Sequence, residues 1–315
     1  MRIATPFLVF TTLLFSACDR TGSAIEKDYP VMKITDRVYV IHGPNEYPNK
    51  ANQAFMNNPG FVLTKKGVVV IDPGSSLQTG QMVLKKIATI TQNPVIAVFN
   101  THIHGDHWLG NDAIHRVYPK AVIYGHPKMI GKASEAGEFW IGLFNRLTDN
   151  AVRGTRPVIP VMGIENEETL SLNGVHFRAY HTGVAHTDGD LMIEVVEEKV
   201  LFAGDNVMAV RAGRLDDGHF KGNIEACEVA LKTAAQHFVP GHGPTNGRDI
   251  VVAYRDWLKA VILSVRKYHA QGLADFEMKD KVVADLKPFQ QWAGFEVEIG
   301  KLISLAVLQL EQEAF

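Results

Sequence analysis

The segment Asn100–His107 concentrates side chains that bind metal ions. It reads Asn-Thr-His-Ile-His-Gly-Asp-His, so three imidazoles (His102, His104, His107) and the carboxylate of Asp106 fall within six positions. Imidazole and carboxylate together are ligands of zinc, iron and manganese, whereas calcium takes oxygen ligands alone. The spacing of His102 and His104 lets two imidazoles chelate one ion, and the following pair of ligands can face a second ion. The segment therefore predicts a metal centre.

The elements around this segment are expected to hold it in place. The preceding run, Val95–Phe99, is short and wholly apolar, which predicts a strand covered on both faces. A helix is expected directly after the ligands, over Trp108–Val117. Ligands at the end of a strand are held by a rigid element while they remain open to solvent. We therefore expect the metal centre at the carboxyl end of a buried strand.

Three later segments carry the same ligand types in short motifs: Val184–Asp188, Phe202–Asp205 and Pro240–Gly243. Together with the H-x-H-x-D-H motif at 102–107 and with Asp72, they resemble, in the same order, the motifs of the metallo-β-lactamase superfamily. The resemblance covers about residues 35–245. It implies an α/β fold, the four-layer αββα metallo-β-lactamase sandwich, here with a helical C-terminal extension.

The resemblance also implies a ligand set for two metal ions. The first ion would be held by His102, His104 and His186. The second would be held by Asp106, His107 and His242, and Asp205 would bridge the two ions. Asp106 would in addition act as the catalytic residue that orients a metal-bridging hydroxide. Two zinc ions per chain are expected, and iron and manganese are the other metals that this ligand set accepts.

The residue at position 205 distinguishes subfamilies. The best-known β-lactamases of this fold place a cysteine at the second metal there, whereas glyoxalase-II-type thioesterases and many other hydrolases have a bridging aspartate. This chain has Asp205 at that position. Cys227 lies outside the motif and cannot replace it. We therefore expect a metal-dependent hydrolase that cleaves an ester-like bond of a small molecule: a thioester, a lactone or a β-lactam.

Two other functions remain open. A mononuclear-iron sulfur or persulfide oxygenase has the same fold but leaves much of the second metal site unused, and a metal-bearing binding protein would show no turnover. The complete second set, Asp106, His107 and His242, favours the binuclear hydrolase over both. The chain also resembles, more weakly, exported metallohydrolases found alongside quinoprotein dehydrogenases and sulfur-oxidation systems, whose substrates are poorly defined.

A β-β-α-β pattern occurs twice and indicates an internally duplicated, layered domain. Its first copy is expected over Gly60–Leu63, Val68–Ile71, a helix within Gln81–Ile90, and Val95–Phe99. Its second copy is expected over Leu191–Val196, Val200–Phe202, a helix over Ile224–Ala235, and His237–Val239. The Lys-Lys-Gly turn between the first two runs predicts a β-hairpin, and Ser75-Ser76 is expected to cap a helix rather than to act in catalysis.

Helices are expected at two further places. Lys128–Leu147 is predicted as a helix beside the metal centre, and helices dominate from Asp249 onward, with Pro288 as the first residue of the last one. Aromatic residues at helical spacing in this C-terminal part are interpreted as core packing. We expect a leader and tether at 1–24, the metallo-β-lactamase-fold domain at 30–250, and the helical extension, packed on that domain, at 251–315.

The substrate is expected to contact three loops: Asn45–Asn58, Glu135–Arg156 and Arg211–Asn223. Within them Phe139 and Trp140 are candidate apolar contacts and Arg211 is a candidate cationic contact. Among the remaining histidines, His181 is interpreted as packed in the core or as a partner of a ligand, and His219 as an ordinary loop residue.

The N-terminal segment predicts export. Arg2 precedes an apolar stretch, Ile3–Phe15, that is too short to span a bilayer and is typical of a signal peptide. Phe15-Ser16-Ala17-Cys18 resembles a lipobox, so we expect a periplasmic lipoprotein anchored to the membrane through Cys18, with cleavage after Ala24 as the alternative. Cys227, the other cysteine, is expected to be a buried, inert thiol.

The composition restricts the class of partner. The chain has 315 residues, is 46% hydrophobic, and has a formal net charge of −2. A charge so near zero gives no electrostatic reason to expect a nucleic acid. The segment Pro127–Pro157 is also too short for the inserted domain that nucleases of this superfamily carry. We expect a small-molecule substrate, and no protein partner is predicted.

Overall fold

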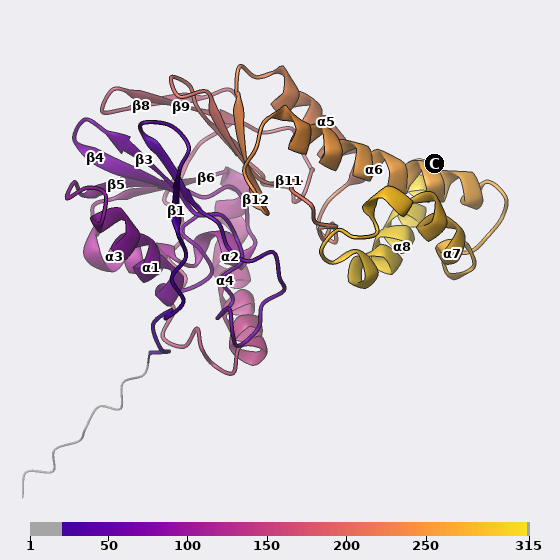
Figure 1. The fold of residues 1–315 in the computed structure, drawn as a ribbon, viewed down its shortest axis with the longest axis horizontal. Coiled ribbons are helices and arrows are strands. Elements are labelled where there is room, and N and C mark those ends of the chain that lie inside the picture. Colours follow the sequence, from indigo (N-terminus) through magenta and orange to yellow (C-terminus); the bar gives the residue numbers. More distant parts are fainter. Residues whose placement is uncertain (1–20, 314–315) are drawn as a thin grey trace, which may run out of the picture.

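Two β-sheets lie face to face between two layers of helices in a computed structural model that describes residues 21–313 (Figure 1). This arrangement confirms the predicted αββα sandwich. Residues 1–20, which contain the predicted leader and Cys18, lie outside the described residues. Within the described part no helix is long and apolar enough to cross a membrane.

The first sheet is formed by the N-terminal half of the described chain. Its strands are hydrogen-bonded in chain order: β1 (Val31–Lys33), β2 (Val38–Ile41), β3 (Gly60–Thr64), β4 (Gly67–Ile71), β5 (Val95–Phe99), β6 (Val122–Gly125) and β7 (Met162–Gly163). Strands β1 to β4 pair antiparallel, and from β4 to β7 the pairing is parallel. The predicted hairpin is confirmed, because Thr64 pairs with Gly67 across the two-residue turn between β3 and β4.

The second sheet has the order β12-β11-β10-β9-β8. Its strands are β8 (Thr169–Leu172), β9 (Val175–Tyr180), β10 (Met192–Val195), β11 (Val200–Met208) and β12 (His237–His242). Neighbours pair antiparallel except for β11 and β12, which are parallel, with register shifts at Gly204 and Met208. Strand β11 is longer than expected and contains Asp205 within it.

Helices cover the outer faces of the sheets. Those between β4 and β7 are α1 (Leu77–Ala88), α2 (Gly105–Trp108), α3 (Asn111–Val117) and α4 (Pro127–Leu147). Those after β11 are α5 (Phe220–Lys232), α6 (Arg248–His269), α7 (Asp275–Asp285), the 3-10 helix η1 (Lys287–Phe289) and α8 (Phe295–Glu313). The predicted repeat is therefore present as β3-β4-α1-β5 and β10-β11-α5-β12, each with an antiparallel pair followed by a parallel one.

Separate apolar clusters fill the spaces between these layers. Alternate side chains of a strand point to opposite faces of its sheet. On β4, Val69 and Ile71 therefore pack between the two sheets, whereas Val68 and Val70 pack under α1. The ring centroids of Phe99 and Phe177, one from each sheet, lie 5.4 Å apart. The short apolar runs of the sequence are strands because both of their faces are covered.

Local signals explain where some helices begin and break. The Ser76 hydroxyl accepts a hydrogen bond from Thr79 N (3.1 Å) as part of a capping box, which confirms the predicted cap. The single helix expected over Trp108–Val117 is wrong, because α2 ends at Trp108 and α3 begins at Asn111. Between them Gly110 N donates to Gly74 O (2.7 Å), outside the helix, and this contact with the β4–α1 loop interrupts the helical hydrogen bonding.

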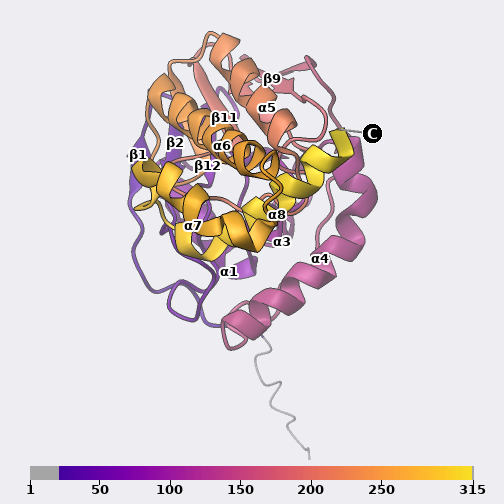
Figure 2. The same ribbon diagram turned by 90° about the vertical axis from the view of Figure 1, so that its right-hand side faces the viewer.

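The C-terminal helices pack around one tryptophan. Trp257 of α6 is fully buried, and its ring centroid lies 5.3 Å from that of Phe289 and 5.8 Å from those of Trp292 and Phe295. The interpretation of these aromatic residues as core packing is confirmed. The prediction that Pro288 begins the last helix is wrong, because Pro288 lies in η1 and Gly294 (φ +81°) precedes α8. Figure 1 shows α6, α7 and α8 gathered at one end of the molecule, and Figure 2, viewed from that end, shows α4 running along the edge.

Cys227 lies on α5 with its side chain fully buried, as predicted. Its Sγ atom lies 3.4 Å from the carbonyl oxygen of Asn206. Burial raises the pKa of this thiol above its ordinary value, because a thiolate would lose its hydration there. Cys227 is therefore a packing residue and takes no part in the site described below.

Candidate metal centre

All seven predicted ligands meet at one end of the sandwich. His102 and His104 follow β5, and Asp106 and His107 belong to α2. The other three come from the second sheet: the loop between β9 and β10, the middle of β11 and the end of β12 supply His186, Asp205 and His242. Segments that follow or belong to strands of both sheets therefore contribute to one cluster, and two of the ligands, Asp205 and His242, lie on strands themselves.

Two glycines allow the ligand segments to approach each other. A Cβ atom on Gly241 would lie only 1.8 Å from Asp205 Oδ1, so any side chain there would overlap the carboxylate. A Cβ atom on Gly204, whose φ is +52°, would lie 2.7 Å from Thr101 Oγ1. Glycine at both positions is thus required by the close contact of β11 with its neighbours.

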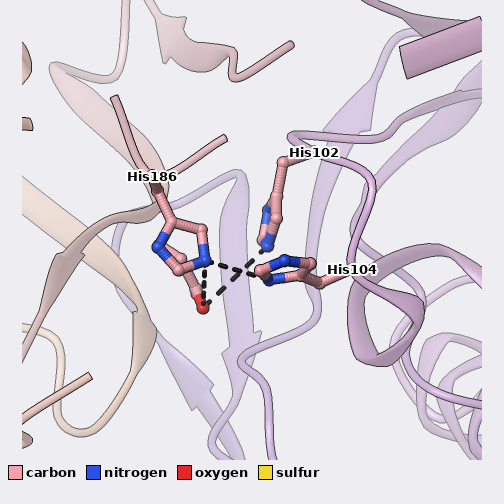
Figure 3. Close-up of side chains that lie close together, drawn as sticks. His102, His104 and His186 are labelled. Carbon is pink, nitrogen blue, oxygen red and sulfur yellow. Dashed lines mark hydrogen bonds and ion pairs between the residues drawn. The ribbon is translucent and has the colours of Figure 1, made fainter. Parts of the chain in front are cut away.

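The first group of ligands contains His102, His104, His186 and Asp205, whose candidate ligand atoms all lie within 4.8 Å of one another. Figure 3 shows the three imidazoles converging on one point. His186 Nε2 lies 3.0 Å from His104 Nδ1 and 3.4 Å from Asp205 Oδ2. His102 Nε2 lies 3.9 Å from the same carboxylate oxygen. These distances place four donor atoms around a volume that one ion can fill.

The second group contains Asp106, His107 and His242, again with candidate ligand atoms within 4.8 Å of one another. His242 Nε2 lies 3.2 Å from Asp106 Oδ2, and His107 Nε2 lies 3.5 Å from it. Asp205 also faces this group, because its Oδ1 is 3.1 Å from His107 Nε2 and its Oδ2 is 3.3 Å from His242 Nε2. The carboxylate of Asp205 therefore lies between the two groups.

The donor atoms fit divalent metal ions. Among residues 21–313, His102 Nε2 and His107 Nε2 are buried and have no hydrogen-bond partner, although buried polar atoms are normally satisfied. Both nitrogens point into the cluster, where a metal ion would supply the missing partner. Imidazole nitrogens with carboxylate oxygens are the donor set of catalytic zinc sites. The cluster is thus a site for divalent metal.

Burial lowers the pKa values of the buried ligand histidines, whereas nearby carboxylates raise them. Burial lowers the pKa of His102 well below its usual range and that of His186 to about 3, so both are neutral at pH 7 and keep a lone pair for a metal. Burial also acts against a charge on His107, but the carboxylates of Asp205 and Asp106 outweigh it and raise the pKa well above the ordinary value. The surroundings of His107 therefore stabilise positive charge, whether of a proton or of a metal ion.

Residues outside the two ligand groups hydrogen-bond to the imidazoles and orient them. Asp72 accepts hydrogen bonds from Thr101 N (2.8 Å), from Thr101 Oγ1 (2.6 Å) and from His107 Nδ1 (2.8 Å). Thr101 Oγ1 also lies 3.0 Å from His102 Nδ1, so one carboxylate supports a ligand of each group. Such contacts fix the ring orientation and the tautomer of a metal-binding histidine. Asp72, one of the residues on which the resemblance depends, therefore positions ligands of both groups.

Substituting Asp72 with asparagine is expected to weaken divalent-metal binding about ten- to a hundredfold. The change keeps the side-chain shape, and asparagine tolerates the left-handed backbone conformation of Asp72 (φ +50°), so the loss reflects the missing negative charge and the hydrogen-bond acceptor that the amide NH2 replaces. Competition with a chelating dye measures the affinity. Asp149→Asn, on an exposed carboxylate paired with Lys50, is the matched control, and equal affinities for both variants would contradict the role of Asp72.

Two hydrogen-bond partners of the ligand histidines could not be predicted from the sequence. Asp217 Oδ2 lies 2.8 Å from His104 Nε2, and the backbone oxygen of Met56 lies 2.9 Å from His242 Nδ1. Asp217 falls within the predicted rim loop Arg211–Asn223, but nothing in its neighbours distinguished it. A backbone carbonyl has no sequence signal at all. Among the three histidines of the first group, only His104 contacts an exposed carboxylate of residues 21–313 through its other ring nitrogen.

A cavity of about 340 Å³ opens over the metal centre. Each of the three segments predicted to contact the substrate contributes to its lining, for example through Tyr47, Trp140 and Arg211. The prediction of Glu135–Arg156 as a loop is wrong up to Leu147, because α4 extends to that residue and carries Trp140. Phe139, predicted as a contact, is instead 59% exposed and packs edge-on against the Trp140 ring without lining the cavity. A volume of this size suits a small molecule.

The other singled-out histidines lie outside the ligand cluster. His181 Nδ1 is 2.8 Å from the carbonyl oxygen of Asp190, and its ring stacks on that of His126 with centroids 3.9 Å apart. This agrees with the interpretation of His181 as a packed histidine. His219 is the N-cap of α5, where its Nδ1 accepts a hydrogen bond from Lys221 N (3.2 Å).

An αββα sandwich with a buried histidine and carboxylate cluster at its strand ends defines a metal-dependent enzyme. Residues 53–262 of this chain match the family model of the metallo-beta-lactamase superfamily. The chain belongs to this superfamily and is a metal-dependent hydrolase.

Individual relatives agree with this assignment. A probable metallo-hydrolase of Streptococcus pyogenes is 26% identical over 219 residues, which cover 68% of this chain and 85% of the relative. A hydroxyacylglutathione hydrolase of Acaryochloris marina is 40% identical over 75 residues, but these cover only 23% of this chain and 27% of that enzyme. The structure of a metallo-beta-lactamase from Pontibacter korlensis superposes with a TM-score of 0.59 at 23% identity, over 74% of this chain and 99% of its own. That likeness shows the common fold.

Proposed function

We propose that this chain is an exported hydrolase with two zinc ions that cleaves an ester-like bond of a small molecule: a thioester, a lactone or a β-lactam. The position of Asp205 carries the proposal. One of its oxygens lies 3.1 Å from His107 Nε2 in the second group, and the other lies 3.4 Å from His186 Nε2 in the first. A single carboxylate between two sets of imidazoles supports two ions held close together.

The residues of the chain have distinct tasks in this reaction. Bound divalent ions supply an acidified water and a Lewis acid for the bond to be cleaved. The predicted site residues hold these ions: His102, His104, Asp106, His107, His186, Asp205 and His242. Asp106, which lines the cavity, is also placed to accept a hydrogen bond from the attacking water and so to orient it. No serine or cysteine nucleophile is required.

The second group of ligands supports hydrolysis over oxygenation. A mononuclear iron enzyme would leave Asp106, His107 and His242 without a function, although all three are buried. The names of two of the similar proteins, hydroxyacylglutathione hydrolase and metallo-beta-lactamase, refer to a thioester and to a β-lactam. Asp205, at the position where the best-known β-lactamases of this fold have a cysteine, favours the thioester and the lactone over the β-lactam.

Export is part of the same proposal and depends on the sequence alone. The apolar stretch Ile3–Phe15 and the lipobox-like segment ending at Cys18 support a periplasmic lipoprotein. The proposed partner is a small-molecule substrate, with no nucleic acid and no protein.

Metal content and substrate range together test the proposal. We expect mass spectrometry of the purified protein to find about two zinc ions per chain. We expect the same preparation to hydrolyse one of three probes: a chromogenic cephalosporin, a glutathione thioester or a lactone. A single iron per chain, with none of the probes cleaved, would instead support the mononuclear sulfur oxygenase.

A further inference from the structure

The cavity over the metal centre has two unlike walls. On one side α4 presents Trp140, Leu143 and Phe144, which are apolar. On the other side the loop after β11 presents Arg211, and α8 presents Lys301. Residues of both α4 and α8 line the cavity, and Figure 2 shows these as two separate helices, with α4 along the edge of the molecule. A ligand that fills this space meets an apolar surface and a cationic surface at the same time.

Arg211 is a buried cation without an anionic partner. Its relative exposure is 7%. Its Nη1 donates to Asn45 Oδ1 (3.0 Å) and to the backbone oxygen of Glu46 (3.3 Å), and its guanidinium lies 5.1 Å from the ring centroid of Tyr47. All three partners are neutral groups, and no ion pair found among residues 21–313 includes Arg211. Buried charges are normally paired, so this guanidinium lacks the anion that such a site ordinarily contains.

The backbone next to Arg211 is in an unfavourable conformation. Val210, directly before it, has a φ of +53°, which is an unfavourable conformation for a β-branched residue. This conformation is held by the chain segment before α8: Ala293 N donates to Val210 O (3.0 Å), and Ala212 N donates to Ala293 O (2.9 Å). Strained residues of this kind persist where the surrounding structure fixes them, and they cluster at ligand sites.

The side-chain surroundings of Arg211 are also tied to the C-terminal helices. Tyr47 OH donates to Glu298 Oε1 (2.8 Å), and Lys301 Nζ donates to Glu298 Oε2 (3.1 Å). Glu298 is 1% exposed, so this carboxylate is committed to its two donors and is not the partner of Arg211. The side of the cavity that carries Arg211, called the cationic wall below, thus combines three segments far apart in the sequence. They are the β2–β3 loop with Tyr47, the loop after β11 with Arg211, and α8 with Glu298 and Lys301.

From this arrangement we infer that Arg211 binds an anionic group of the substrate, and that the substrate is an amphiphilic anion whose apolar part packs against α4. This inference rests on the proposed function, because it assigns the substrate class of the same cavity. Arg211 donates through the N–H groups that Asn45 and Glu46 leave free. Lys301 is already paired with Glu298, so Arg211 is the cation that an anionic ligand would meet. A neutral molecule of the same size would leave the guanidinium without a counter-charge.

Binding of two probes that differ in charge tests the inference. The probes are 1-octanesulfonate, which has no ester bond to cleave, and 1-octanol, which has the same chain length. We expect the zinc-loaded protein to bind the sulfonate more tightly than the alcohol by isothermal titration calorimetry. We expect Arg211→Gln to weaken sulfonate binding roughly ten- to a hundredfold, the usual effect of losing a hydrogen bond between charged groups, and to leave alcohol binding and zinc content unchanged.

Two further variants make the result specific. Arg211→Lys keeps the charge and is expected to recover part of the sulfonate affinity, and Arg266→Gln, on an arginine of α6 that does not line the cavity, is expected to bind both probes as the unchanged protein does. Equal affinity for sulfonate and alcohol, or unchanged sulfonate binding in Arg211→Gln, overturns the inference. If sulfonate binding depends on Arg211 but no ester-like probe is hydrolysed, the inference stands and the proposed hydrolysis fails. If hydrolysis occurs while Arg211 has no effect on sulfonate binding, the inference alone fails.

Discussion

His102→Ala is expected to lower hydrolysis by at least roughly a thousandfold, since bound metal supplies several kcal/mol of transition-state stabilisation and each 1.36 kcal/mol changes a rate tenfold. His102 is 1% exposed, and its Nε2 points into the cluster without a hydrogen-bond partner among the described residues. Removing the imidazole takes away one donor of the first group and leaves His104, His186 and Asp205. The zinc content is therefore expected to fall as well, from about two ions per chain toward one.

The measurement combines initial rates with metal analysis of the same preparation. His115→Ala is the matched control, because it is the same substitution at an exposed histidine of α3, outside the ligand groups. It should retain both the rate and the metal. A His102→Ala protein with full zinc content and full activity would show that the first group is not the site of the reaction.

Trp257→Ala is expected to have the largest effect on stability, lowering the free energy of unfolding by roughly 3–5 kcal/mol. Trp257 is fully buried on α6, and its ring contacts Phe289, Trp292 and Phe295 at the junction of the C-terminal helices. Alanine would leave a cavity that these rigid aromatic neighbours cannot fill. Urea titration followed by circular dichroism measures the change as a lower midpoint at an unchanged slope.

Phe276→Ala is the matched control for this measurement. Phe276 lies on α7 and is 78% exposed, so its truncation should change the stability by no more than about 0.5 kcal/mol. If both substitutions destabilise the protein equally, the aromatic cluster around Trp257 does not hold the C-terminal helices together.

The sequence predicted the strands near the metal centre well, for a physical reason. Val68–Ile71 and Val95–Phe99 are apolar at every position, and a run of that length and composition is stable only when both faces are covered. The hairpin before them was predictable because a turn with glycine lies between two β-branched runs. The ligands could be predicted because their types and spacing are unusual for either a core or a surface.

The remaining features depend on contacts between distant residues. The break between α2 and α3 arises from a hydrogen bond of Gly110 to the β4–α1 loop. The spacing of apolar residues along a helix cannot predict such a contact. The contact of Asp217 with His104 joins residues 113 positions apart. Pro288 suits the first turn of a helix, but the chain has a positive φ at Gly294, and this residue delays α8 by more than a turn. Local signals of this kind are correct for an element and wrong for its boundary.

The cationic wall of the cavity has a consequence for biosynthesis. A chain made from its N-terminus has all seven predicted ligands once His242 has been added, but Glu298 and Lys301 follow more than fifty residues later. Helix α8 packs into the same buried core as β11, which carries Asp205, and domains generally fold as units, so the α8 wall completes the cavity only after the whole domain has been made. The metal ligands and the wall that faces the substrate are therefore encoded far apart in the sequence and become functional together, once the last helix has packed.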